Sequence, residues 1–343
     1  MVAEISPMLE KRGEQVDVLL FDGEETPFKS ELEETGIRVM SLSKNDQVYD
    51  IRHIFKLIPI IRNYDIVHTH NSACQMYVAI AKTLAHAHCK LVTTEHNTDN
   101  RRRHICWFKP IDKWMYRQYD VIISISHKAT ELLKAYIGRE DIRTIENGVN
   151  VDKYNKADAY GDLRKDGEVI ICMVAAFRPQ KDQDTLIKTM GSLPDNYVLW
   201  LIGDGERKEI CVKQVSDMKL DGRVKFFGVR TDIPELLKTS DIIVMSTHYE
   251  GMSLSNIEGM SVGRPFVASD VNGIHEITYG AGILFEEGNS EQLAAEIKHL
   301  HDDRTYYDSV ADACYERAKQ FDISKMVDGY EDVYKELTKT NEA

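Results

Sequence analysis

Short apolar runs alternate with helical stretches along almost the whole of this 343-residue chain. Runs that are rich in β-branched residues and separated by helices are typical of parallel sheets with helices on both faces. There are twelve such runs, which would be unusually many strands for one sheet. The pattern therefore predicts an α/β protein with two doubly wound, Rossmann-like domains. Six runs lie in the first half and six in the second: VDVLLF, IRVMSL, YDIVHTH, KLVTTEH, DVIISIS and IRTIEN, then EVIICMVAAF, YVLWLIG, RVKFFG, DIIVMS, RPFVAS and AGILF.

A polar stretch at residues 149–168 lacks apolar periodicity and contains two glycines. Stretches of this composition commonly join domains. We therefore predict an N-terminal domain over residues 1–155 and a second domain over residues 165–302. Residues 303–343 are predicted to be helical, and we expect the last of these helices to pack back on the N-terminal domain.

The chain begins with a predicted helix, VAEISPMLEKRG, which leads into the first strand. A doubly wound domain normally opens with a strand and a glycine-rich turn before its first helix. Either this fold lacks that strand and turn, or the chain starts late.

The net charge of −13 argues against binding to bulk nucleic acid. The charge is unevenly distributed, with a net of −1 up to Asn150 and −12 after it. A nearly neutral first half can lie against an anionic membrane more easily than the acidic second half. The six cysteines have no metal-site spacing, and no signal peptide precedes the first strand. We therefore expect a cytoplasmic protein with reduced cysteines, able to contact the inner face of the cell membrane through its N-terminal domain.

Two glutamates, Glu250 and Glu258, stand eight positions apart around a glycine and several small or apolar residues. A helix is predicted at residues 253–262, and the free N–H groups at its start can hold a phosphate. Glu258 would lie near that helix end and could accept two hydrogen bonds from a ribose diol. Glu250, on the loop, could reach hydroxyls on the group attached to the phosphate. The motif predicts a site for a nucleotide diphosphate sugar.

Residues 227–277, which contain this motif, resemble the donor domain of the retaining glycosyltransferases of family four (group 1), which have the GT-B fold. The resemblance implies two Rossmann-like domains that face each other across a cleft. It also implies transfer of a sugar from a UDP- or GDP-sugar to a hydroxyl of a glycan or lipid-linked saccharide, with retention of anomeric configuration. Such reactions build bacterial polysaccharides and glycolipids.

The resemblance assigns Arg178 and Lys181, on the loop after the first donor-domain strand, to neutralising the diphosphate. The commonest family sequence has its arginine at the position of Ala176 here. Glu258 matches the ribose-binding residue, and Glu250 matches the residue that contacts the donor sugar. A further four residues match the loop that embraces the sugar and its β-phosphate: Gly251, Met252, Ser253 and Leu254.

Four other positions are matched to the donor site. Val229 and Arg230 stand where family members contact the base. His70 matches an N-domain histidine near the donor sugar and phosphate. Asn147 matches a residue at the interdomain hinge that faces the cleft.

No metal or other cofactor is expected. The one Asp-x-Asp sequence, Asp182 to Asp184, begins a predicted helix and is interpreted as a helix cap. The sequence Gly203–Gly205 is interpreted as a turn, because it has no third glycine to form a dinucleotide-binding fingerprint.

Two other functions fit the same pattern: a nucleotide-sugar 2-epimerase of the same fold, or a truncated donor-binding subunit without activity of its own. A further alternative concerns the basic segment Arg101–Arg103 and the Trp107, Phe108 and Lys109 that follow it. This segment either meets lipid phosphates or forms an exposed helix start whose apolar residues face inward.

Overall fold

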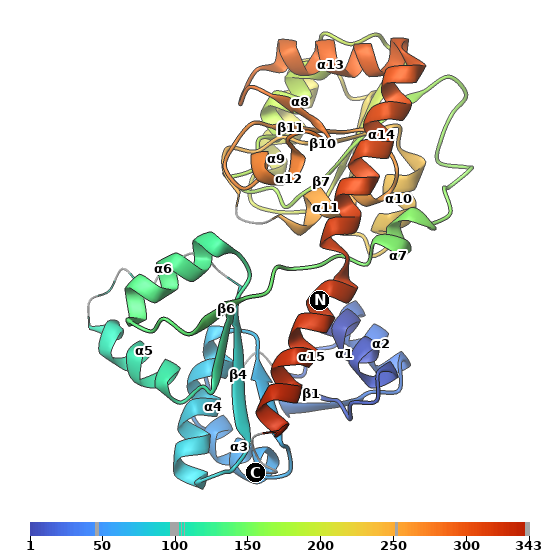
Figure 1. Cartoon of the computed structure of the whole chain (residues 1–343). Coiled ribbons are helices and arrows are strands. Elements are labelled where there is room, and N and C mark those ends of the chain that lie inside the picture. The colour runs from blue at the N-terminus through green and yellow to red at the C-terminus, as the bar shows by residue number, and fades with distance from the viewer. Residues whose placement is uncertain (45–47, 97–102, 104, 106, 251–252, 340–343) are drawn as a thin grey trace. The chain divides into compact units, whose positions relative to one another are not determined.

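The computed structural model describes all residues except 45–47, 97–102, 104, 106, 251–252 and 340–343. The chain divides into two compact units (Figure 1). The N-terminal unit consists of Met1–Asn147 together with Ile323–Ala343, and the C-terminal unit consists of Gly148–Asp322.

Each of the twelve predicted strand runs contains a strand. The strands are β1 (Asp17–Asp22), β2 (Arg38–Ser43), β3 (Ile66–Thr69), β4 (Lys90–Glu95), β5 (Val121–Ser124), β6 (Ile142–Thr144), β7 (Val169–Val174), β8 (Tyr197–Ile202), β9 (Val224–Gly228), β10 (Ile242–Met245), β11 (Phe266–Ser269) and β12 (Ile283–Phe285).

A helix stands between each strand and the next, as the alternating pattern predicts. They are α1 (Val2–Lys11), α2 (Pro27–Glu34), α3 (Arg52–Ile61), α4 (Ser72–Ala85), α5 (Phe108–Arg117), α6 (His127–Ile137), α7 (Val151–Asn155), α8 (Gln183–Met190), α9 (Lys208–Asp217), α10 (Ile233–Thr239), α11 (Leu254–Ser261), α12 (His275–Thr278), α13 (Ser290–Asp302), α14 (Arg304–Ala318) and α15 (Ile323–Lys339), with a 3-10 turn at Lys319–Phe321.

The strands of the N-terminal unit form two separate parallel sheets. One has the order β3-β4-β5-β6, and the other pairs β1 with β2. Ile122 and Leu91 face one helical layer, while Val92 and Ile123 face the other. Helix α15 belongs to the second layer, where its buried face packs together with α1 (Figure 1).

The C-terminal unit contains one six-stranded parallel sheet in the order β12-β11-β10-β7-β8-β9. Its central strands are almost wholly buried and apolar, as the continuous apolar runs predict. The chain winds from β7 outward to β9 and then returns to β10 on the other side of β7. Ligands of doubly wound proteins bind where the winding direction reverses, beyond the carboxyl ends of the strands. The loops after β7 and β10 are therefore the expected place for a site.

Candidate functional site

The loops after β7 and β10 are tied together by main-chain hydrogen bonds. Lys181 and Thr247 form an antiparallel bridge. The amide of Asp182 donates to the carbonyl of Ser246 at 3.0 Å, and the amide of His248 donates to the carbonyl of Gln180 at 2.9 Å. These bonds fix the side chains of both loops at the reversal point of the sheet.

Lys181 and Glu250 form an ion pair at this junction. Their side chains are only 13% and 10% exposed, so solvent screens the pair weakly. The Thr247 hydroxyl lies 3.3 Å from the same carboxylate oxygen of Glu250, and the Met245 sulfur lies 3.8 Å from the Lys181 ammonium. The two residues that the sequence assigns to phosphate and sugar are thus in contact with each other.

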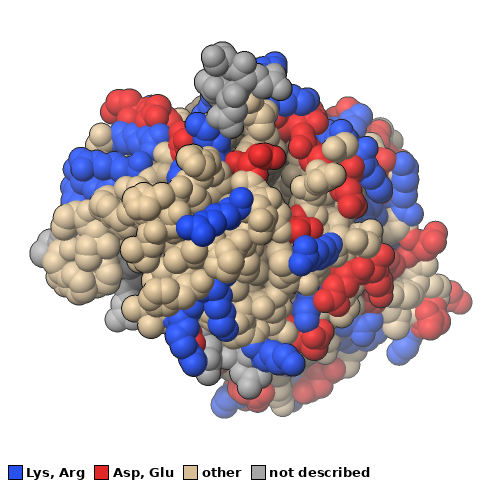
Figure 2. Space-filling view, turned by 90° about the horizontal axis from the view of Figure 1, so that it is seen from below, with Lys and Arg blue, Asp and Glu red and all other residues tan. Residues whose placement is uncertain are grey.

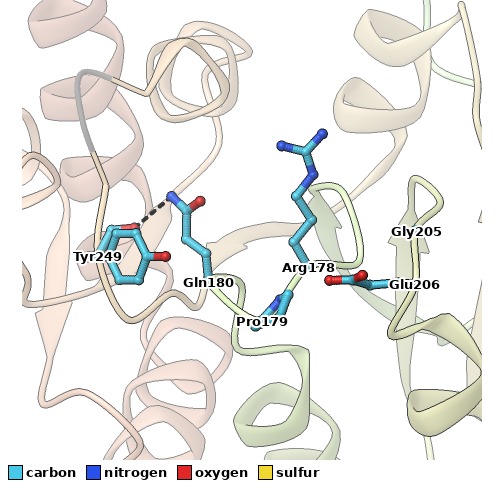
Figure 3. Close-up of a pocket in the computed structure, with 6 residues that line it drawn as sticks. All are labelled: Arg178, Pro179, Gln180, Gly205, Glu206 and Tyr249. Carbon is cyan, nitrogen blue, oxygen red and sulfur yellow. Dashed lines mark hydrogen bonds between the residues drawn. The ribbon is translucent and has the colours of Figure 1, made fainter. Parts of the chain in front are cut away.

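Arg178 lies at the edge of an open cavity of about 360 Å³. Its side chain is extended, and its guanidinium points away from Pro179 and Glu206 (Figure 3). In the part of the chain that the structure describes, no carboxylate pairs with Arg178, so its guanidinium is available to an anion. Gln180 spans the opposite side of the cavity by donating to the carbonyl of Tyr249 at 2.8 Å.

The turn at Gly203–Gly205 supplies the third wall of the cavity, through Gly205 and Glu206. Sequence reasoning missed this role, although the turn itself was predicted. Gly203 and Gly205 have φ of +137° and +153°, and a Cβ on Gly205 would lie 2.4 Å from the carbonyl oxygen of Phe177. The two glycines therefore let this loop lie directly on the Ala175–Phe177 backbone, just before Arg178.

Gly205→Ala is expected to destabilise the C-terminal unit by about 2 kcal/mol or more, because the new Cβ meets rigid backbone and the φ is strained for alanine. Gly222→Ala is a matched control, since nothing lies within 4 Å of its added Cβ and its φ is ordinary. Thermal unfolding measures both. Equal stability of the two variants would contradict the close packing of this loop.

Helix α11, which follows the β10 loop, carries Glu258. Ser253 stands at its N-cap, and Leu254 begins the helix. A Cβ on Gly259 would lie 2.9 Å from Ile243 and Phe266, so the helix packs tightly on the sheet and holds half-buried Glu258 in place. Asn256, which the sequence did not single out, is buried with both amide atoms unpartnered among the described residues. Gly251 and Met252 lie outside the described residues.

Val229 and Arg230 follow β9 at the same end of the sheet. Val229 is 78% exposed. The guanidinium of Arg230 is paired with Asp232 at 2.5 Å, and Tyr160 donates to the same carboxylate at 2.7 Å. The Val229 side chain is therefore open to a ligand at this position, whereas the Arg230 charge is already neutralised.

His70 and Asn147 belong to the N-terminal unit. His70 Nδ1 lies 3.1 Å from His96 Nε2, and the His70 ring stacks on His68. His68 contacts the hydroxyls of Tyr334 at 2.6 Å and Thr94 at 2.8 Å, as a structural residue would. Asn147 is buried, and its side-chain oxygen has no hydrogen-bond partner among the described residues.

The histidine cluster is held neutral. Burial, the charge of His96 and the Met1 amino group lower the pKa of His70 to about 3. Burial and the same amino group lower the pKa of His96 to about 4. The unfolded chain binds these protons near pH 6.5 and the folded chain does not, so stability falls as pH decreases from 6.5 toward 4.

One pH unit below 6.5, the two histidines are expected to lower the free energy of unfolding by about 3 kcal/mol in total. His70→Gln with His96→Gln should flatten the dependence of the unfolding midpoint on pH over this range. Exposed His127→Gln serves as the control and should keep the wild-type slope. A double variant with the wild-type slope would show that these histidines do not titrate on unfolding.

In the ranges that the structure describes, no three His, Cys, Asp or Glu residues are placed to hold a metal ion. None of the described helices is long and apolar enough to cross a membrane. The side chain of Asp182 caps α8 by accepting from the amide of Thr185 at 3.1 Å, which confirms the predicted cap.

Two family matches account for nearly all of the chain. Residues 1–153 match the family described as Glycosyltransferase Family 4, and residues 156–321 match the family described as Glycosyl transferases group 1. The chain therefore belongs to the group 1, family 4 glycosyltransferases.

Curated relatives agree with this membership. An Escherichia coli UDP-Gal:alpha-D-GlcNAc-diphosphoundecaprenol alpha-1,3-galactosyltransferase is 27% identical over 94% of this chain and 89% of its own. The N-acetyl-alpha-D-glucosaminyl L-malate synthase of Bacillus anthracis is also 27% identical, over 83% of this chain and 79% of its own.

Solved structures show the fold. Anabaena Alr3699/HepE in complex with UDP and glucose superposes with a TM-score of 0.81 at 21% identity, covering 97% of this chain and 94% of its own. Because this solved structure superposes on nearly the whole chain and the chain forms two Rossmann-like units, we conclude that the protein has the GT-B fold.

Proposed function

We propose that this protein transfers a sugar from a UDP-sugar to a hydroxyl of a saccharide linked to a polyprenyl diphosphate, with retention of anomeric configuration. The observation that carries the proposal is the junction of the β7 and β10 loops, which brings Lys181 and Glu250 together beside the Arg178 cavity. The substrate classes are taken from a relative of this chain. The Escherichia coli galactosyltransferase reported above is named for UDP-Gal as donor and a diphosphoundecaprenol-linked acceptor.

The chemical demand of this reaction is stabilisation of the departing diphosphate. In the proposed complex Arg178, whose guanidinium pairs with no carboxylate among the described residues, binds the diphosphate through its planar fork. Lys181 supplies a second, point-like charge from its fixed position. The start of α11 adds main-chain N–H groups. We propose that these groups suffice without a metal ion, so that activity persists in EDTA.

Glu250 has two successive roles in this proposal. It holds the Lys181 ammonium before the donor arrives and then accepts hydrogen bonds from sugar hydroxyls. Glu258 accepts from the ribose diol, and Val229 lies against the base. Retention would follow if the acceptor hydroxyl attacks the anomeric carbon from the same face from which the diphosphate leaves. Determining the anomeric configuration of the product by NMR tests this part of the proposal.

The test of the proposal is UDP release from UDP-galactose, UDP-glucose and UDP-N-acetylglucosamine, with and without an undecaprenyl-diphosphate-linked saccharide. Release that depends on the acceptor, together with a lengthened lipid-linked product, supports the transferase. Epimerisation of the donor without acceptor would instead support the 2-epimerase. Nucleotide binding without turnover of any donor would support a donor-binding subunit that needs further residues.

A further inference from the structure

The loop after β10, at Ser246–Glu250, is tied to segments at the ends of three other strands. Toward β7, the amide of His248 donates to the carbonyl of Gln180 at 2.9 Å. Toward β11, the amide of Thr247 donates to the hydroxyl of buried Ser269 at 3.0 Å. Toward β12, the ring of His248 reaches the loop that follows that strand. The first two ties use main-chain groups of the β10 loop, whereas the third depends on its side chain alone.

The third tie is a pair between a histidine and a carboxylate. His248 Nδ1 lies 2.6 Å from Glu287 Oε1, and because a carboxylate only accepts, Nδ1 carries the proton and donates it. Glu287 is 39 positions further along the chain, in the short loop between β12 and α13. The pair therefore fastens the loop that carries Glu250 to the edge strand of the sheet, across β11.

The exposure of this pair argues against a role in stability. The side chains of His248 and Glu287 are 43% and 45% exposed, and pairs with such exposure contribute little to folding. Basic and acidic side chains lie next to one another at many places on the face that Figure 2 shows. Pairs such as Lys213–Asp217 and Arg304–Asp308 join neighbouring turns of one helix. The His248–Glu287 pair instead joins two loops, one of which carries a residue of the candidate site.

The loop that carries Glu287 is fixed at both of its ends. The amide of Glu286 donates to the side-chain oxygen of Gln292 at 2.8 Å. The side chain of Asn289 caps α13 by accepting from the amide of Gln292 at 3.0 Å. Glu287 lies between these two anchored residues, so its carboxylate is a firm attachment point for His248.

The position of Glu250 depends on the path of the main chain two residues earlier. The Glu250 side chain is only 10% exposed, and its carboxylate lies 3.3 Å from the hydroxyl of Thr247. The carbonyl of Tyr249 accepts from the side chain of Gln180 at 2.8 Å. A displacement at His248 would reach Glu250 through one intervening residue, and small displacements of contact groups lower reaction rates strongly.

We propose that Glu287 is a positioning residue for sugar transfer. Through His248 it fixes the loop after β10, so that the Glu250 carboxylate is already in place when the hydroxyls of the donor sugar arrive. This inference rests on the proposed function, because it requires the contact between Glu250 and the donor sugar. Glu287 itself touches no part of the donor in this account.

Two substitutions of Glu287 test the role by calorimetric titration with UDP and with the tightest-binding of UDP-galactose, UDP-glucose and UDP-N-acetylglucosamine. Glu287→Ala removes the attachment point and should weaken binding of the UDP-sugar roughly twofold to fivefold, with binding of UDP unchanged. Glu287→Gln keeps an oxygen that can accept from His248 and should restore most of the affinity. Asp308→Asn, which breaks an exposed pair within α14, is the matched control and should bind both ligands like the wild type.

A double variant shows whether the effect passes through Glu250. In the background of Glu250→Ala, the further change Glu287→Ala should cost no additional affinity for the UDP-sugar, because the group that it positions is already gone. Thermal unfolding should give Glu287→Ala the midpoint of the wild type, as expected for an exposed pair.

The outcomes separate this role from the proposed function. A wild type that binds and turns over a UDP-sugar, with Glu287→Ala of equal affinity, would overturn the positioning role and leave the proposed function standing. Equal losses for UDP and the UDP-sugar, additive losses in the double variant, or a lowered unfolding midpoint of Glu287→Ala would make the pair structural and also overturn the role. A wild type that binds none of the three UDP-sugars would overturn both.

Discussion

Replacing Lys181 by alanine is expected to lower kcat/KM for the nucleotide-sugar donor by about tenfold to a hundredfold. A charge-assisted hydrogen bond to phosphate contributes roughly 1.5–3 kcal/mol, and Lys181 has its ammonium fixed at the reversal point of the sheet. Nucleotide release under steady-state conditions measures the loss. Lys188→Ala, which removes an exposed lysine from α8, is the matched control and should leave turnover unchanged.

The same substitution leaves the Glu250 carboxylate, whose side chain is only 10% exposed, without its counter-ion, which is expected to cost about 3 kcal/mol of stability. Adding Glu250→Gln should restore most of the unfolding midpoint, because the uncompensated charge is then gone. Activity should stay low in the double variant. Full activity in Lys181→Ala at a temperature where it is folded would show that the lysine is needed only for structure.

Glu258 and Glu250 are expected to affect different parts of the donor. Glu258→Gln should weaken UDP and UDP-glucose binding alike, by about tenfold to a hundredfold, since both carry the ribose that it contacts. Glu250→Gln should weaken only UDP-glucose, and UDP should bind as tightly as before or more tightly because Lys181 loses its competing carboxylate.

Calorimetric titration of each variant with both ligands gives this comparison. Glu291→Gln, at an exposed position in the first turn of α13, is the control. Equal losses for both ligands in both variants would contradict the division into ribose and sugar contacts.

The fold could be predicted because its strands are short and apolar, and because the helices between them have clearly periodic apolar residues. The four central strands of the C-terminal sheet, β7, β8, β10 and β11, are buried on both faces, so their sequences are continuous apolar runs. The separation of β1–β2 from β3–β6 could not be predicted, since both sets carry the same apolar pattern. Which strands pair depends on packing that the periodicity does not encode.

The site could be predicted only where its residues are close in sequence. Glu250 and Glu258 belong to one loop and helix, so their spacing was informative. The pairing of Lys181 with Glu250 joins positions 69 residues apart, and the contribution of Glu206 depends on how the Gly203–Gly205 turn lies on the preceding loop. Such contacts follow from the sheet order, which a single sequence does not specify.

The central claim, a UDP-sugar donor site on the C-terminal unit, is tested most directly by thermal unfolding of the wild type in titrations with UDP, GDP and ADP. A ligand at about 100 times its Kd adds roughly 2.7 kcal/mol to the stability of the unit that binds it. We predict that UDP raises the unfolding temperature at concentrations where GDP and ADP do not, and that Glu258→Ala reduces the shift to about half or less. No shift with UDP, or an equal shift in the variant, would contradict the assignment of this site.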